Sequence, residues 1–292
     1  MMLREKLDQG GFAVLAEFEP PKGADFSEML TNAVNVKGRV DAFVVPEMAN
    51  AVMKASSLGG CLFLQTNGMQ TVFQVCCRDR NRLALQADIL SAAALGIPNL
   101  MVVKGDDITV GDHPQARAVN DIDVFQLLEV IEQMRNGKDM AGIELKGAPD
   151  FFVGAFFNAG AQGGLLDLEF EELEKKIDLG VKFVITSPVF DLKILERILK
   201  RLSKDKVALI PKVLLLKSAG MARYINRNIK NISIPENLIK SIQKAPDKPR
   251  ECVKIAADMI KQIKGLELPG VAISTMGWED KLPQILDESN IL

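Results

Sequence analysis

The stretch NRLALQADILSAAALGIPNLMVVKGDD (residues 81–107) contains one complete helix–strand unit and the start of a polar loop. Its first part repeats apolar residues with the 3.6-residue spacing of a helix and ends at Gly96, and glycine is common just after a helix C-terminus. The next part, NLMVVKG (99–105), is a nearly continuous apolar run, which is typical of a parallel strand buried on both faces. The unit therefore predicts a parallel sheet covered by helices.

Units of this kind recur along the whole chain. Apolar runs bounded by Gly, Pro, Asn or Asp occur at 12–19, 40–47, 71–76, 99–105, 151–158, 182–188, 207–215 and 271–276. Segments with helical spacing occupy 81–96, 124–134, 168–180 and 193–202. Eight runs alternating with helices over 292 residues favour one closed (β/α)8 TIM barrel, with an open doubly wound sheet as the alternative.

The more polar segment 226–251 lies between the seventh and eighth runs. Its prolines, Pro235, Pro246 and Pro249, suit helix starts and loops rather than a domain linker. We therefore expect an extra helix before the last strand and a single domain over residues 1–292.

The composition excludes several classes of protein. Hydrophobic residues make up 48% of the chain and charged residues 25%, which suits a large folded core. A net charge of -2 with dispersed Lys and Arg argues against a nucleic-acid partner. No run approaches the ~18 apolar residues of a membrane span, and the charged N-terminus lacks a signal core, so we expect a cytoplasmic protein. Four cysteines without a C-x-x-C pair and one histidine give no evident metal site.

In a barrel of this kind, the active site is built from side chains at the carboxyl ends of the strands. The polar residues at those positions are Glu17, Glu19, Glu47, Asn50, Gln74, Lys104, Asp106, Asp107, Asn158, Thr186, Ser187, Lys212 and Lys217. Burying carboxylates is costly unless a ligand, proton or partner compensates, which favours the acidic ends of the first and fourth strands as functional positions. We interpret Asp106 as a functional residue and Asp107 as a loop or capping residue.

Glu17 and Glu19 are two residues apart, so in a strand both point to the same side. Repulsion between two carboxylates raises one pKa, and a carboxyl group that stays protonated near neutral pH suits general-acid catalysis. The chain has no G-x-G-x-x-G motif and no P-loop, which disfavours a Rossmann-type nicotinamide site and phosphoryl transfer.

Four ordered blocks resemble the methylenetetrahydrofolate reductase family of flavin-dependent TIM barrels. They are EFEPPK (17–22), CRDRN (77–81), LGIPNLMVVKGDD (95–107) and KKIDLGVKFVITSPVFD (175–191), with GVAISTMGWE (270–279) fitting the last strand. The resemblance implies a flavin across the barrel mouth, usually FAD with FMN as the alternative. It also implies hydride transfer from reduced flavin N5 to 5,10-methylenetetrahydrofolate, which yields 5-methyltetrahydrofolate.

The resemblance also assigns roles to individual residues. The family's general acid falls on Glu17, and its acid near the flavin pyrimidine and the pterin falls on Asp106. Cofactor-binding positions fall on Gln74, Lys104, Gly105, Asn120, Asp121, Phe156, Lys175 and Lys176, and the last two would contact the FAD diphosphate. Substrate-binding positions fall on Glu19, Ser187 and Ala219.

Several of these positions differ from the family pattern. Gln74 replaces a usual histidine, Ser187 a common glutamine and Ala219 a common aromatic residue. The small residues Ser187 and Ala219 weaken a stacking site for NAD(P)H, so the electron donor is NAD(P)H or a partner redox subunit, and we expect an oligomer or a complex. Two alternatives remain. One is a non-catalytic reductase-like subunit that docks a redox or methyltransferase protein, and the other is a pterin-binding barrel that passes a methyl group to a corrinoid protein.

Overall fold

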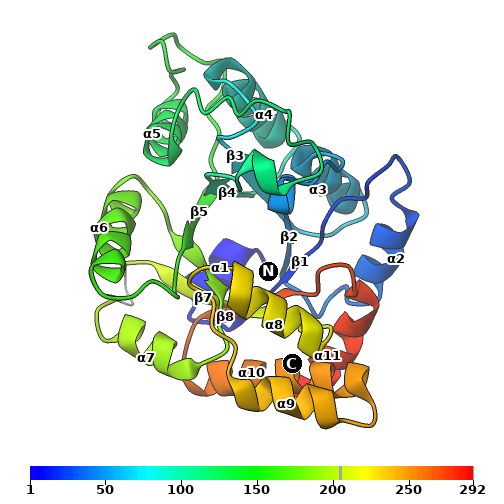
Figure 1. Ribbon diagram of the computed structural model, residues 1–292. Coiled ribbons are helices and arrows are strands. Elements are labelled where there is room, and N and C mark those ends of the chain that lie inside the picture. The colour runs from blue at the N-terminus through cyan, green and yellow to red at the C-terminus, as the bar shows by residue number, and fades with distance from the viewer. Residues whose placement is uncertain (204–205, 292) are drawn as a thin grey trace.

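The strands form a closed barrel (Figure 1). In the computed structural model, which describes residues 1–203 and 206–291, eight parallel strands pair in chain order and β8 pairs with β1. Their bounds are Ala13–Glu17 (β1), Ala42–Val45 (β2), Thr71–Cys76 (β3), Asn99–Val103 (β4), Phe152–Phe157 (β5), Phe183–Pro188 (β6), Ala208–Leu214 (β7) and Gly270–Ser274 (β8). The closure confirms the predicted TIM barrel and excludes the open sheet.

A ring of helices surrounds the barrel (Figure 1). The helices that follow β1 to β6 and β8 are α2 (Ser27–Val34), α3 (Ser57–Thr66), α4 (Arg82–Ala94), α5 (Val124–Arg135), α6 (Gly164–Asp178), α7 (Leu192–Leu199) and α11 (Leu282–Ser289). Short 3-10 turns span Ala49–Ala51 (η1), Ile108–Val110 (η2) and Glu279–Lys281 (η3). Local capping sets some helix starts, since Asn81 accepts hydrogen bonds from the Leu83 and Ala84 N–H groups at the start of α4.

The segment between β7 and β8 contains α8 (Ala219–Asn228), α9 (Glu236–Lys244) and α10 (Lys248–Gly265). Pro235 immediately precedes α9, and Pro249 lies in the first turn of α10, so both prolines mark helix starts as expected. α10 packs against β7 and β8, whereas α8 begins close to the carboxyl end of β7. A β/α unit needs one helix here, so the extra helix predicted before β8 is confirmed. The described part of this segment contains one helix more than that prediction.

Side chains of the strands alternate between the barrel interior and the helix layer. On β1, Leu15 packs inside the barrel, whereas Val14 packs against the helices. Leu3 of α1 (Leu3–Asp8) belongs to the same interior cluster and closes its N-terminal end. Phe183 stacks on Phe152 in this cluster, at the starts of β6 and β5. Because alternate residues of a strand share a face, Glu17 points into the interior at its carboxyl end.

Candidate functional site

Three side chains from neighbouring strands meet at the carboxyl end of the barrel interior. Glu17 of β1 accepts a hydrogen bond at Oε2 from Lys212 Nζ of β7, at 2.7 Å, and one at Oε1 from Ser274 Oγ of β8, also at 2.7 Å. The Glu17 and Lys212 side chains are only 13% and 19% exposed. We call Glu17, Lys212 and Ser274 the floor cluster, because they lie at the bottom of the open end of the barrel.

The floor cluster holds Glu17 as a carboxylate. Burial alone would raise the pKa of Glu17, but the Lys212 ammonium and the hydrogen bonds from Lys212 and Ser274 outweigh burial and place that pKa below its ordinary value. Glu19 forms its own ion pair with Lys54. The expectation that repulsion from Glu19 keeps Glu17 protonated is therefore wrong, because a lysine from elsewhere in the chain compensates each acid.

Two more predicted residues are buried on other strands of the barrel. Ser187 of β6 is 6% exposed, and its Oγ has no hydrogen-bond partner in the part of the chain that the structure describes. Gln74 of β3 is also buried, and its Oε1 accepts a hydrogen bond from the Glu47 backbone N–H at 3.3 Å. Buried polar atoms are normally paired, so the Ser187 hydroxyl is an exception, and it lies closed off from solvent where β6 is irregular between Ile185 and Pro188.

The loop after β4 carries three predicted residues, the exposed Lys104 and Asp106 and the partly buried Gly105. Gly105 has a φ of +93°, and a Cβ there would lie 2.5 Å from Cys76 Sγ and 2.8 Å from Arg78 Cβ. Packing within the protein therefore requires glycine at this position. Asp106 Oδ2 accepts a hydrogen bond from the Asn50 N–H at 2.7 Å, which joins the loop after β4 to the loop after β2.

Arg78 connects the loops at the rim of the barrel mouth. It is not among the predicted site residues. Its side chain is almost fully buried and forms an ion pair with Asp79. It also donates hydrogen bonds to the Asp106 carbonyl oxygen at 3.1 Å and to the Met48 carbonyl oxygen at 3.3 Å. Arg78 thus ties together the loops that follow β2, β3 and β4, and the sequence carries no signal of which loops a buried arginine reaches.

Phe156 and Lys176 lie together on the side of β5. Phe156 is 41% exposed and belongs to the inward-facing set of β5, so its ring borders the mouth. Lys176 of α6 is 7% exposed, and its Nζ lies 3.4 Å from both the Phe156 carbonyl oxygen and Glu172 Oε2. Lys175 is exposed on the same helix, so only one of the two predicted lysines turns toward the barrel.

The predicted loop residues Asn120 and Asp121 are both exposed. Asn120 has a φ of +41°, and its neighbour Val119 donates a backbone hydrogen bond to the Arg78 carbonyl oxygen at 2.7 Å. The Asp121 carboxylate accepts hydrogen bonds from the backbone and side chain of Arg82 at the start of α4. Both residues therefore lie beside the Arg78 rim and outside the floor cluster.

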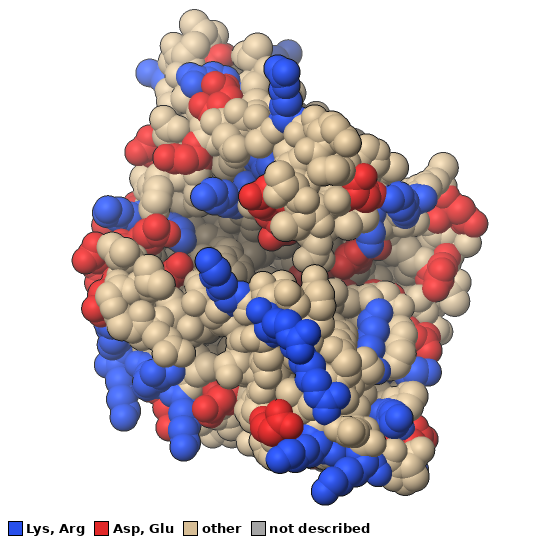
Figure 2. Space-filling model, in the orientation of Figure 1, with Lys and Arg blue, Asp and Glu red and all other residues tan. Residues whose placement is uncertain are grey.

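Helix α8 borders the mouth on the β7 side. Ala219 lies in its first turn and packs against the core between barrel and helices, so the structure does not bring this residue to the floor cluster. The loop after α8 reaches the loop after β5, where Gly160 lies against the Asn231 carbonyl oxygen. Figure 2 shows a hollow at the centre of this face, with Lys and Arg side chains at its edge over α8.

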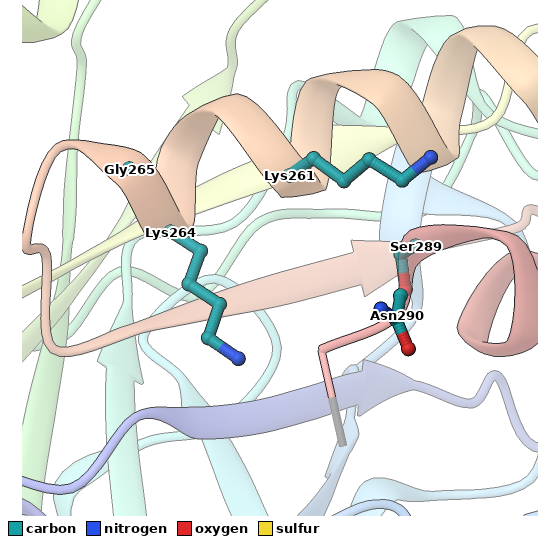
Figure 3. Close-up of a pocket in the computed structure, with 5 residues that line it drawn as sticks. All are labelled: Lys261, Lys264, Gly265, Ser289 and Asn290. Carbon is teal, nitrogen blue, oxygen red and sulfur yellow. The ribbon is translucent and has the colours of Figure 1, made fainter.

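Two cavities lie away from the mouth. One of about 340 Å³ is lined by Lys261, Lys264, Gly265, Ser289 and Asn290, where α10 and α11 end (Figure 3). Another of about 620 Å³ is lined by residues that include Phe152, Ala208 and Pro269, at the starts of β5, β7 and β8. Both are at the amino ends of the strands, whereas barrel enzymes build their active sites at the carboxyl ends, so the mouth is the candidate active site.

Among residues 1–203 and 206–291, no group of three His, Cys, Asp or Glu side chains is arranged to hold a metal ion. No helix in the same ranges has the length and apolar character needed to cross a bilayer. Cys76 and Cys77 are buried, and burial raises the pKa of their thiols to about 12 and about 11, which leaves neither poised as a nucleophile.

The fold defines a TIM-barrel protein, and the mouth of the barrel is its candidate site. EDTA monooxygenase from Chelativorans sp. BNC1 is similar to it in structure, with a TM-score of 0.57, 11% identity, and coverage of 95% of this chain and 92% of that chain. A trigonal crystal form of 2,3-dimethylmalate lyase gives a TM-score of 0.56 at 9% identity, over 99% and 81% of the two chains. At such low identity these similarities show the fold alone. No curated protein matches the sequence.

The sequence profile of the methylenetetrahydrofolate reductase family matches residues 2–290. The chain belongs to the methylenetetrahydrofolate reductase family, which confirms the resemblance carried by the four sequence blocks. Membership supports a flavin-linked folate reductase kind of function, because the family is generally flavin-dependent and uses folate-related substrates.

The residues at the mouth fit a flavin and a second polar heterocycle. An exposed aromatic ring, Phe156, borders the hollow, and the Gln74 amide is a polar group on the interior face of β3. Lys176 provides a cation beside the end of β5. Ligand sites commonly combine apolar walls with a few convergent polar groups, and this mouth has both.

Proposed function

We propose that the protein reduces 5,10-methylenetetrahydrofolate to 5-methyltetrahydrofolate with a bound flavin. The observation that carries the proposal is the carboxylate of Glu17 at the floor of an open barrel mouth, in a chain that matches the reductase family over residues 2–290. A flavin at this mouth supplies the hydride, from its reduced N5. The protein supplies placement and a proton.

In this proposal Glu17 gives a proton to a nitrogen of the substrate's five-membered ring. The bond between that nitrogen and the methylene carbon then breaks, so the carbon becomes able to accept hydride. Ser274 holds Glu17 Oε1 in place, and the free Ser187 hydroxyl binds a polar edge of the pterin. Asp106, at the rim, contacts the pterin and the flavin pyrimidine, and Glu19 stays near the substrate entrance.

The flavin is held by residues on the β3 to β6 side of the mouth. Gln74 faces the ring system, and Lys104 and Gly105 lie on the loop after β4. Phe156, Asn120 and Asp121 border the nucleotide, and Lys176 pairs with the diphosphate with weaker support from Lys175. A diphosphate contact favours FAD over FMN.

The electron donor is NAD(P)H or a partner redox subunit, and we propose a complex or an oligomer in the cytoplasm. Ser187 and Ala219 are small, and Ala219 packs into the core, which supports the partner subunit because neither residue can stack on a nicotinamide ring. A steady-state assay with NADH and NADPH separates the two donors, since turnover with either nucleotide alone makes a partner unnecessary.

A flavin spectrum of the purified protein tests the proposal. We expect a yellow protein whose released cofactor has the mass of FAD, whose colour bleaches on chemical reduction, and whose colour returns when methylenetetrahydrofolate is added. A colourless protein that cannot be loaded with either flavin would support the non-catalytic subunit, and tight binding of methyltetrahydrofolate without a flavin would support the corrinoid methyltransferase alternative.

A further inference from the structure

Lys212 is the one group of the floor cluster that the proposed reaction does not yet use. It lies on β7 at an inward-facing position, two residues beyond the interior Ile210, and its Nζ contacts the carboxylate of Glu17 directly. An ion pair screened from water costs desolvation on both sides, so a lysine at the floor of a mouth needs a stabilising partner or a function. The pair is therefore a candidate for proton chemistry.

The same contact creates a difficulty for Glu17. A carboxylate that is already ionised has no proton to give, and the floor cluster favours the ionised form. A proton is nevertheless present in the pair, on Lys212 Nζ, 2.7 Å from Glu17 Oε2. A general acid must lie within hydrogen-bond reach of the proton it transfers, and this distance meets that requirement.

We infer that Lys212 is a positioning residue of the reduction that supplies, through Glu17, the proton used at the substrate nitrogen. This inference rests on the proposed function. A proton passes from Lys212 Nζ to Glu17 Oε2, and Glu17 passes a proton to the ring nitrogen. The carbon–nitrogen bond breaks, its electron pair stays on the protonated nitrogen, and the neutral Lys212 amine later regains a proton from solvent.

Ligand binding favours this transfer on electrostatic grounds. When a ligand covers the mouth and excludes water, two separate charges become costlier to maintain, and the neutral amine and carboxylic acid are favoured relative to the ion pair. After Glu17 gives up its proton, the floor cluster carries a net negative charge. That charge stabilises the positive charge left on the substrate.

Other charged groups around the floor have partners of their own, so Lys212 is the cation that faces Glu17. In the part of the chain that the structure describes, these partnerships are Lys54 with Glu19, Arg80 with Glu47, Lys22 with Asp112, Lys217 with the Met276 carbonyl oxygen, and Glu279 with the Gly277 N–H. The polar side chains of β6 and β8 beside Lys212 are hydroxyl groups: Thr186, which accepts a hydrogen bond from the Lys212 N–H, Ser187, and Ser274. Proton transfer at this site therefore involves Glu17 and Lys212.

Two substitutions of Lys212 separate a proton source from a mere positive charge. Lys212→Arg keeps a cation beside Glu17, but a guanidinium does not release its proton. Lys212→Met removes the charge and leaves a side chain of similar length. Ser274→Ala serves as the matched control, because it removes the other hydrogen bond of Glu17 and keeps the lysine.

The first readout does not depend on turnover. Infrared difference spectra between the native protein and Glu17→Gln identify the Glu17 band, and we expect a carboxylate that becomes a protonated carboxyl when 5-methyltetrahydrofolate is added. Lys212→Arg should keep the carboxylate band on addition of the ligand. Equal bands in native protein and Lys212→Arg would overturn the inference.

The second readout is the rate at which methylenetetrahydrofolate reoxidises the chemically reduced flavoprotein, measured against pH. We expect Lys212→Arg to be slower by about 100-fold near neutral pH. Lys212→Met should be active while Glu17 carries its own proton and should lose activity as the pH rises through the pKa of Glu17, which burial raises once the lysine is gone. Ser274→Ala should shift the profile less than Lys212→Met does, because the Ser274 hydrogen bond lowers the pKa of Glu17 less than the Lys212 charge does. If the native protein is not reoxidised at all, the proposed function fails. If it is and the Lys212→Met profile matches it, only the inference about Lys212 fails.

Discussion

Glu17 Oε2 lies 2.7 Å from Lys212 Nζ, and this ion pair connects the first strand of the barrel to the seventh. The Coulombic attraction and the hydrogen bond oppose the effect of burial, so the pKa of Glu17 lies below its ordinary value. The charge of the candidate acid is thus set by a residue 195 positions away in the sequence. The first three predictions concern this pair and its surroundings.

Glu17→Gln should block folate reduction and spare reduction of the flavin. Glutamine keeps the shape of the side chain but cannot carry a proton to the substrate. We expect methylenetetrahydrofolate to reoxidise the reduced variant more slowly by about 10²- to 10⁴-fold. Stopped-flow measurement of each half-reaction checks this, and native rates in both would show that Glu17 is not the acid.

Glu19→Gln should leave the pH dependence of folate reduction in place. Glu19 pairs with Lys54, so removing its charge frees that lysine at the rim and does not change the partner of Glu17. We expect a modest change in KM for the substrate and an unshifted pH profile. A profile that moves to lower pH in the variant would instead support direct repulsion between the two glutamates.

The contribution of the Glu17 ion pair to the unfolding free energy should be lost in acid. Because the folded-state pKa of Glu17 is lowered, its contribution is complete above the unfolded value of about 4.3 and is lost as the pH falls through the lower folded-state pKa. The difference in unfolding free energy between native protein and Glu17→Gln should therefore shrink from pH 6 to pH 3, by about 1.4 kcal/mol for each unit of pKa lowering. Urea unfolding at both pH values measures it, and a constant difference would contradict the pairing.

The fold could be predicted from the sequence because its signals are local. Each of the apolar runs and the glycine at 96 reports on its own segment, and parallel strands need no distant information beyond their alternation with helices. The loop interpretation of Asp107 is local too, and the structure confirms it, since Asp107 accepts a hydrogen bond from the Thr109 N–H at the start of η2.

The candidate site could be predicted only in part, because its decisive contacts join distant strands. The resemblance led to Glu17, which faces the interior, and to Ser187, which is buried on β6. The sequence places Lys212 at a strand end but does not show that it meets Glu17. Ser274 carries no charge, so the sequence does not mark it as a site residue. Ala219 is assigned through the resemblance, but its side chain packs against the core between the barrel and the helices.

Gly105→Ala should destabilise the rim of the mouth more than a matched glycine substitution. A positive φ costs an L-residue about 1–2 kcal/mol, and crowding against Cys76 and Arg78 adds about 1–3 kcal/mol. Gly137 has a φ of +80° and open space around its Cα, so Gly137→Ala isolates the first of these costs. Denaturant unfolding of both variants checks the difference, and equal losses would mean that the loop after β4 yields without strain.

Lys176→Met should weaken binding of FAD, while Lys175→Met should not. Lys176 is almost fully buried with its ammonium at the Phe156 carbonyl oxygen, whereas its neighbour is exposed on the same helix. Losing a charge-assisted hydrogen bond to a diphosphate raises the dissociation constant of FAD by about 10- to 100-fold.

The neighbouring lysine is a matched control, since the two substitutions remove the same charge from adjacent positions of α6. Titration of apoprotein with FAD, followed by flavin fluorescence, measures both variants, and thermal unfolding shows whether each one is folded. FMN lacks the diphosphate, so its affinity should fall less than that of FAD in Lys176→Met. Equal FAD affinities in the two variants would remove Lys176 from the cofactor site and leave the β5 side of the mouth without a cation for the nucleotide.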